Sequence, residues 1–170
     1  MPKSELTARC TNTVDYSKIQ KFVREAKAKV LVGFPAGRMH IETQHDLTNK
    51  GVRRTSSVQG AVENAELAKK LYFGSAEIPA RPFLRDGLLV EKESITKAIK
   101  KEATKALAGS EVNWNKIGAM AVGAVQGLVR SDFYKRSVPN SKETIQRKGS
   151  DTPLIDGGDL MGSLTFVVDK

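Results

Sequence analysis

The chain has little of several residue types on which whole classes of protein depend. Its 170 residues include one cysteine, Cys10, and one tryptophan, and aromatic residues make up 6% of the total. A single cysteine excludes an intramolecular disulfide and any zinc site built from several cysteines. The basic segments also lack the interleaved aromatics on which single-strand binders stack bases. We expect no functional role for Cys10.

Long apolar runs are missing as well. The longest stretch without charge, Ile117 to Val129, falls short of the roughly 18 apolar residues that a bilayer span requires. The first ten residues, MPKSELTARC, have neither the apolar core nor the small-residue cleavage site of a signal peptide. We therefore expect no membrane partner and synthesis in the cytoplasm. The length fits one domain over residues 1–170.

Acidic residues are outnumbered, with 19 against 28 lysines and arginines, so the net charge is +9. Such an excess can neutralise the phosphates of nucleic acid. It can equally reflect solvated helix faces and contacts with acidic partners, which we favour because the charges are dispersed. The main basic segments are Lys18 to Lys29, Lys50 to Arg54, Lys97 to Lys105 and Arg130 to Lys148. A basic nucleic-acid-binding protein remains the alternative function.

The first third of the chain predicts a helix, a strand and an arm. Apolar residues three to four apart indicate an amphipathic helix over Tyr16 to Lys27, and the β-branched run Lys29 to Phe34 indicates a strand. From Arg38 to Gly60 the periodicity disappears and turn residues accumulate. Structureless segments of this length in compact domains are usually functional or disordered. We predict a long flexible arm here, with Lys50 to Gln59 as its interacting part.

The middle of the chain predicts three helices. The first covers Ala61 to Phe73 and stops at Gly74, after which two prolines hold a rigid connector until Phe83. A long, surface-lying amphipathic helix is expected over Leu84 to Ala108. The next, Val112 to Val129, has apolar residues around most of its circumference and should be the buried central helix, with glycines where the backbone must pack closely.

The last segments complete a small sheet. We predict a short strand at Thr144 to Lys148, a turn-rich loop at Gly149 to Gly158, and a closing strand at Leu164 to Val168 beside Lys29 to Phe34. The expected fold class is α+β, with a small, mainly antiparallel sheet packed against two to four helices and a long flexible arm.

Two clusters could in principle bind metal or perform acid–base chemistry. His40 and His45 lie near two acids in HIETQHD, but their spacing matches no zinc motif. The second cluster, Asp151, Asp156 and Asp159, is interpreted as turn-forming because no partner base or nucleophile accompanies it. A hydrolase or nuclease that uses Asp156 and Asp159 is the less favoured alternative.

Motifs for phosphate binding and covalent catalysis are also missing from the sequence. The glycines near residue 157 have no GK[ST] ending, and no serine lies in a G-x-S-x-G elbow. We therefore expect no enzymatic activity, no metal and no cofactor.

Two stretches together resemble a known family. AELAKKLYFGSAEIPARPFLRDGL is similar to the helix, F-G and I-P-x-R-P-F-L signature of small tail-completion and virion-morphogenesis proteins of tailed bacteriophages, relatives of the HK97-type tail-component family. Further along, TIQRKGSDTPLIDGGDLMGSLTFVV resembles the C-terminal stretch of the same family, except that Gly157 stands where a threonine is usual. With a fainter likeness at KVLVGFP, the resemblance covers most of residues 28–168.

The resemblance implies a structural virion protein of the neck, which joins the tail tube to the head connector. It implies a ring of copies, commonly six, with neighbouring neck and tail proteins as partners and genomic DNA passing through the centre. The expected location is the virion neck, after assembly in the host cytoplasm. The structural turn would comprise Asp156, Gly157 and Gly158.

Physical reasoning assigns the proline segment to contacts between subunits. Pro79 and Pro82 reduce the ordering cost of binding, and Arg81 and Arg85 can pair with carboxylates. Whether Ile78, Phe83 and Leu84 serve the interface or plug the subunit's own core stays open. The predicted interface set is Ile78, Pro79, Arg81, Pro82, Phe83, Leu84 and Arg85, together with Lys50, Arg53 and Arg54 of the arm.

Overall fold

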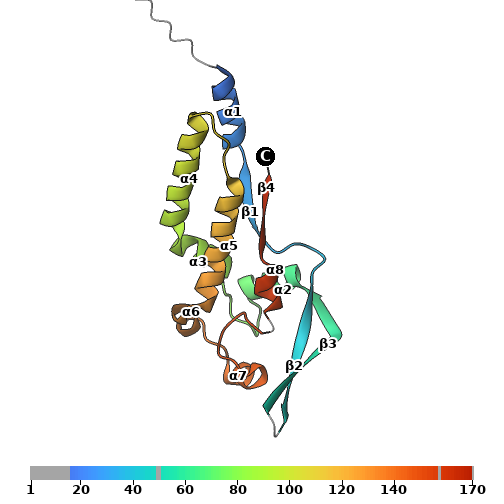
Figure 1. The fold of residues 1–170 in the computed structure, drawn as a ribbon. Coiled ribbons are helices and arrows are strands. Elements are labelled where there is room, and N and C mark those ends of the chain that lie inside the picture. The colour runs from blue at the N-terminus through green and yellow to red at the C-terminus, as the bar shows by residue number, and fades with distance from the viewer. Residues whose placement is uncertain (1–15, 49–50, 157, 170) are drawn as a thin grey trace, which may run out of the picture.

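The computed structural model describes residues 16–48, 51–156 and 158–169 and shows an elongated α+β molecule (Figure 1). The class agrees with the prediction, although the helices are more numerous and shorter than the two to four expected. In chain order the described elements are α1 (Tyr16–Ala26), β1 (Lys29–Gly33), β2 (Met39–Thr48), β3 (Gly51–Glu63), α2 (Asn64–Phe73), α3 (Phe83–Val90), α4 (Lys92–Leu107), α5 (Trp114–Arg130), α6 (Asp132–Ser137), α7 (Lys142–Lys148), α8 (Asp159–Ser163) and β4 (Thr165–Asp169).

The central helix is α5, as its apolar circumference predicted. Its N-terminus is capped by Asn113, whose side chain accepts a hydrogen bond from the backbone N–H of Lys116 at 3.0 Å. Two of its valines, Val125 and Val129, are fully buried. Gly87 of α3 lies against Val125 so closely that an added Cβ would stand 2.6 Å from the Val125 Cα. The core is therefore centred where α3 crosses α5.

A two-stranded sheet covers part of α5. β1 and β4 pair in antiparallel fashion, with Val32 opposite Phe166, which confirms the predicted closing strand. The Phe166 ring lies directly over Gly118, where a Cβ would overlap it. This is the close approach for which a helix interior tolerates glycine despite its cost of about 1 kcal/mol. Two strands that lie far apart in the sequence, β1 and β4, thus meet on the central helix.

The long helix expected over Leu84 to Ala108 is two helices. α3 ends at Val90, and the chain changes direction at Glu91, which has φ −97° and ψ 14°. α3 buries Phe83 and Gly87, whereas α4 buries Glu102 and Ala106. The buried residues are therefore nonpolar in α3, whereas α4 also buries a carboxylate. No proline or glycine stands at the break between the helices, so the local sequence could not reveal it.

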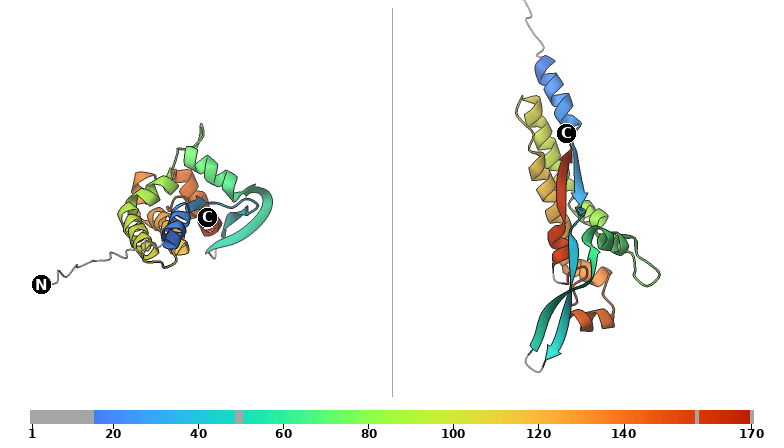
Figure 2. Two further views of the ribbon diagram at one scale, coloured as in Figure 1. Left: turned by 90° about the horizontal axis from the view of Figure 1, so that it is seen from above. Right: turned by 90° about the vertical axis from the view of Figure 1, so that its right-hand side faces the viewer.

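The arm expected to lack secondary structure is a β-hairpin. β2 and β3 pair from Thr48 opposite Gly51 back to Met39 opposite Glu63. The register shifts between His40, opposite Val62, and Glu42, opposite Ser57, which marks a bulge or irregularity. The base contacts α2, α7 and α8, and the rest extends past α7 at the end of the molecule opposite α1 (Figures 1 and 2). The projecting position was therefore predicted correctly and the absence of strands was wrong.

The strand predicted at Thr144 to Lys148 is also wrong, because this segment is helix α7. Ser141 caps the helix by accepting a hydrogen bond from Thr144 N–H at 3.2 Å. Gly149, at φ 65°, ends it in the left-handed conformation that glycine tolerates best. A serine cap and a terminal glycine frame the segment, and these two signals outweigh the β-branched content.

Candidate interaction site

The proline segment folds back onto α2 instead of reaching outward. Ser75 N–H donates to the Ile78 carbonyl at 2.8 Å, and Arg81 N–H donates to the Leu71 carbonyl at 2.9 Å. Gly74 permits the return with φ 78°, since a Cβ there would lie 2.7 Å from the backbone nitrogen of Ala80. The segment is held by hydrogen bonds along its length, as a rigid connector requires.

Phe83 belongs to the subunit's own core. Its side chain is fully buried and meets the rings of Phe34 and Tyr72 edge to face, each with centroids 6.1 Å away. Leu84 packs against the same core from a partly buried position. Of the two interpretations left open by the sequence, the structure supports the core plug, so Phe83 is not an exposed interface anchor.

Arg81 is likewise not an exposed interface residue. Its side chain is only 8% exposed, and its Nη2 donates to the carbonyl of Pro139 at 3.4 Å. Its buried Nε has no hydrogen-bond partner among the described residues. Burial lowers the Arg81 pKa, and the pKa of neighbouring Tyr134 is raised to about 12, chiefly by burial. Arg81 is therefore a desolvated cation inside the fold.

The other predicted interface residues of the proline segment lie at or near the surface. Pro79 is exposed, while Ile78 and Pro82 are half-buried. Arg85 is exposed and forms an ion pair with Asp86 at 3.0 Å. In the hairpin, Arg53 and Arg54 stand in β3 opposite Asp46 and His45. Lys50 and the turn residue Gly157 lie outside the described residues.

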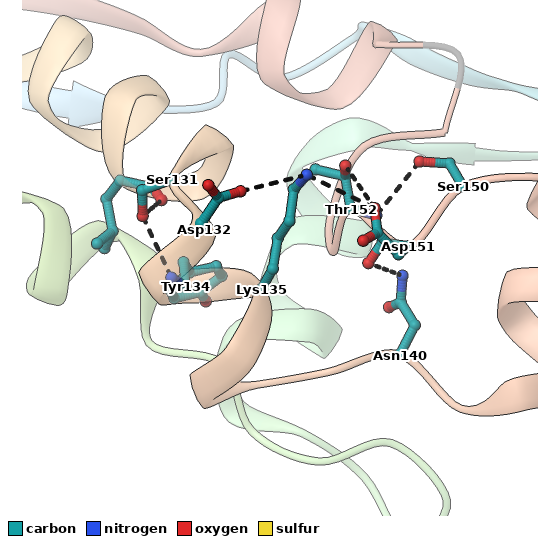
Figure 3. A network of polar contacts seen from close by, with 9 residues as sticks. Ser131, Asp132, Tyr134, Lys135, Asn140, Ser150, Asp151 and Thr152 are labelled. Carbon is teal, nitrogen blue, oxygen red and sulfur yellow. Dashed lines mark hydrogen bonds and ion pairs between the residues drawn. The ribbon is translucent and has the colours of Figure 1, made fainter.

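The C-terminal stretch is ordered by a polar network (Figure 3). Lys135 of α6 lies between Asp132 at 3.8 Å and Asp151 at 3.6 Å. The Asn140 amide donates to the Asp151 carbonyl at 3.2 Å. Gly158, with φ 94°, then turns the chain into α8. Asp151 thus serves this network as an acceptor and ion-pair partner.

Both segments that carry the family resemblance line one cleft of about 600 Å³. Its walls include Ile78, Pro79 and Arg81 from the proline segment, and Arg147, Lys148 and Leu154 from the C-terminal stretch. We call it the basic cleft. Sequence reasoning missed Arg147 and Lys148, because only the helical spacing of α7 brings them to this surface.

The basic cleft contains more positive than negative side chains. Three cations, Arg81, Arg147 and Lys148, face two acids, Glu77 and Asp156. Lys148 is only 9% exposed and its Nζ donates to the Thr152 carbonyl at 3.1 Å. Burial lowers the pKa of Lys148, the carboxylate of Asp156 opposes this effect, and the two arginines add to it.

A second, apolar groove of about 590 Å³ lies on the other side of α5. Its lining includes Gly123 and Gly127 of α5, Phe133 of α6, and Val90 where α3 meets α4. Val90 is 64% exposed and Phe133 66%. We call residues 89–93 the α3–α4 corner. Side chains of this size rarely stay solvated in groups unless they serve a contact.

Comparison with known proteins adds no relative. No family model matches the chain, and neither a curated protein nor a solved structure matches it significantly. Within the described ranges, each helix is too short or too polar to span a bilayer. No group of three His, Cys, Asp or Glu residues in the same ranges is placed to hold a metal ion.

Proposed function

We propose that the chain is a structural subunit of a tailed-phage particle, a neck or tail-completion protein that joins the tail tube to the head connector. The observation that carries this proposal is the meeting of the two family-like segments at the basic cleft. The two segments lie far apart in the sequence, so their neighbourhood in the chain does not explain why both resemble one family. Lining the same cleft would give them a common function.

The hairpin supports a role in assembly. A two-stranded hairpin alone is marginally stable in water, and β2 and β3 pair only with each other among the described strands. Beyond its base the hairpin leaves the body of the molecule (Figure 2). A neighbouring protein that covered it would supply the missing contacts. Exposed backbone edges of this kind are common places for another chain to add.

The basic charge fits the same role. In a ring through which DNA passes, a net charge of +9 would attract the phosphate backbone without reading its sequence. It would equally favour contact with acidic surfaces of adjacent rings. The subunit performs no reaction in this proposal, since its work is to bind copies of itself and the proteins on either side.

The test is to delete the gene that encodes this chain from the phage genome and to examine lysates by electron microscopy. We expect separate heads and tails that join when the purified protein is added back, and a labelled protein located at the junction. Joined, infectious particles formed without the chain would contradict the proposal. Tight duplex binding that falls steeply with salt, together with normal particles, would favour the nucleic-acid alternative.

A further inference from the structure

The basic cleft holds two cations that are nearly removed from water. Arg81 and Lys148 are more than nine-tenths buried, and the charge of Arg81 adds to the burial that lowers the Lys148 pKa. Buried charges are normally paired. Arg81 uses Nη2 for one long bond, its Nε has no hydrogen-bond partner among the described residues, and the two acids of the cleft, Glu77 and Asp156, face three cations. The cleft is therefore built to receive negative charge.

Its walls also specify the shape of the partner. Leucines from α2 and α8, together with Ile78 and Pro79, give the cleft apolar sides around the cations. A free inorganic anion would leave these sides uncovered. A protein segment that carries both apolar side chains and carboxylates would cover the walls and neutralise the cations at once.

The chain itself presents such a segment at the α3–α4 corner. Leu89 is 56% exposed and Val90 64%, and they are followed at the surface by Glu91, Lys92 and Glu93, which leave the corner with a net charge of −1. A helix on each side holds the corner, and Glu91 N–H donates back to the Gly87 carbonyl. A corner already ordered in this way loses little conformational entropy when it binds.

The corner, residues 89–93, and the cleft share no residue. Figure 1 places α4 on one side of α5 and α2 with the hairpin on the other, and the view from above in Figure 2 shows the same separation. A subunit whose two complementary patches are different surfaces can bind its copies head to tail. Such contacts between unlike patches close into rings when the rotation between copies permits.

We propose that the α3–α4 corner of one copy, through Leu89, Val90 and its glutamates, inserts into the basic cleft of the next copy. This inference rests on the proposed function, because it names the contact by which the ring would form. Glu91 and Glu93 meet Arg147 at the mouth of the cleft, and the apolar pair covers Ile78 and Leu154.

The test reverses charges on exposed residues, so that folding is preserved. Arg147→Glu changes the cleft, Glu91→Arg changes the corner, and a third variant carries both changes. Sedimentation equilibrium of the full chain should show self-association of the wild type, weakened roughly tenfold or more by each single change. The double variant should recover most of the loss, because it restores opposite charges. Matched controls are Arg136→Glu on α6 and Glu111→Arg before α5, both exposed and outside the two patches.

Three outcomes would overturn the interface. One is a wild-type chain that stays monomeric at its highest soluble concentration. Another is self-association that neither single reversal weakens more than its control. The third is a double variant whose loss of self-association affinity equals the sum of the two single losses. None of these results decides whether the protein joins heads to tails, which the particle experiment measures separately.

Discussion

The two long faces of α5 differ in how closely the rest of the chain packs against them. On one face Phe166 covers Gly118, and Val125 packs against Gly87. On the other, Gly123 and Gly127 have open space where a Cβ would stand, and they border the apolar groove beside Phe133. The same helix therefore uses glycine for close packing on one face and leaves a groove on the other. The packed face stabilises the monomer, while the open face is available to partners.

The largest expected difference comes from replacing a phenylalanine by alanine in the core and another beside the apolar groove. Phe83→Ala should lower the free energy of unfolding by about 3–5 kcal/mol, because it empties a buried site between Phe34 and Tyr72. Phe133→Ala, at an exposed position, should change it by no more than about 0.5 kcal/mol. Urea unfolding of both variants measures the difference. Equal losses would show that the two faces do not differ as described.

The second test adds one carbon to each kind of glycine. Gly118→Ala should cost about 1–3 kcal/mol, because the new Cβ overlaps the Phe166 ring and forces β4 to move. Gly123→Ala adds its Cβ to open space and should raise stability by up to about 1 kcal/mol through helix propensity. Thermal unfolding at low protein concentration, which avoids self-association, gives both values. A stabilising Gly118→Ala would place Phe166 elsewhere.

How far the sequence predicted this fold depended on whether a segment has a core face. The segments that became β1, α2, α5 and β4 touch the core, and their apolar patterns located them. The hairpin β2–β3 contains few apolar residues, so its sequence gives only a weak period-two pattern. Its turn-forming and polar residues were therefore interpreted as a loop. The helix α7 was missed because the cap at Ser141 and the terminal Gly149 were not used as helix boundaries.

The candidate site was predictable only in part for a related reason. A phenylalanine after a proline has the same local pattern whether it fills a pocket in its own subunit or in a neighbour, and only the tertiary packing of Phe83 decides. The buried state of Arg81 also depends on contacts far along the chain, with the carbonyl of Pro139. The cleft that these residues share with α7 cannot be found from either segment alone.

The smallest expected effect concerns a buried carboxylate in α4, the helix beside α5. Glu102 of α4 accepts from Lys105 Nζ at 2.8 Å and from Asn113 N–H at 3.1 Å, and these bonds lower its pKa below the ordinary 4.5. A depressed carboxylate pKa contributes stability above pH 4.5, which is lost as the pH falls through the folded-state pKa. Glu102→Gln should therefore be less stable than the wild type at neutral pH, with a gap that narrows in acid.

Urea unfolding of both proteins across this acid range measures the gap, and the exposed Glu111→Gln provides the control. Glu102 accepts from Lys105 within α4 and from Asn113 at the end of the loop to α5, so the Gln variant must present a donor where Lys105 or Asn113 already donates. A constant gap at every pH would mean that the loss comes from this donor clash alone. A narrowing gap means that the charge of Glu102 itself helps to fix α4 beside the central helix.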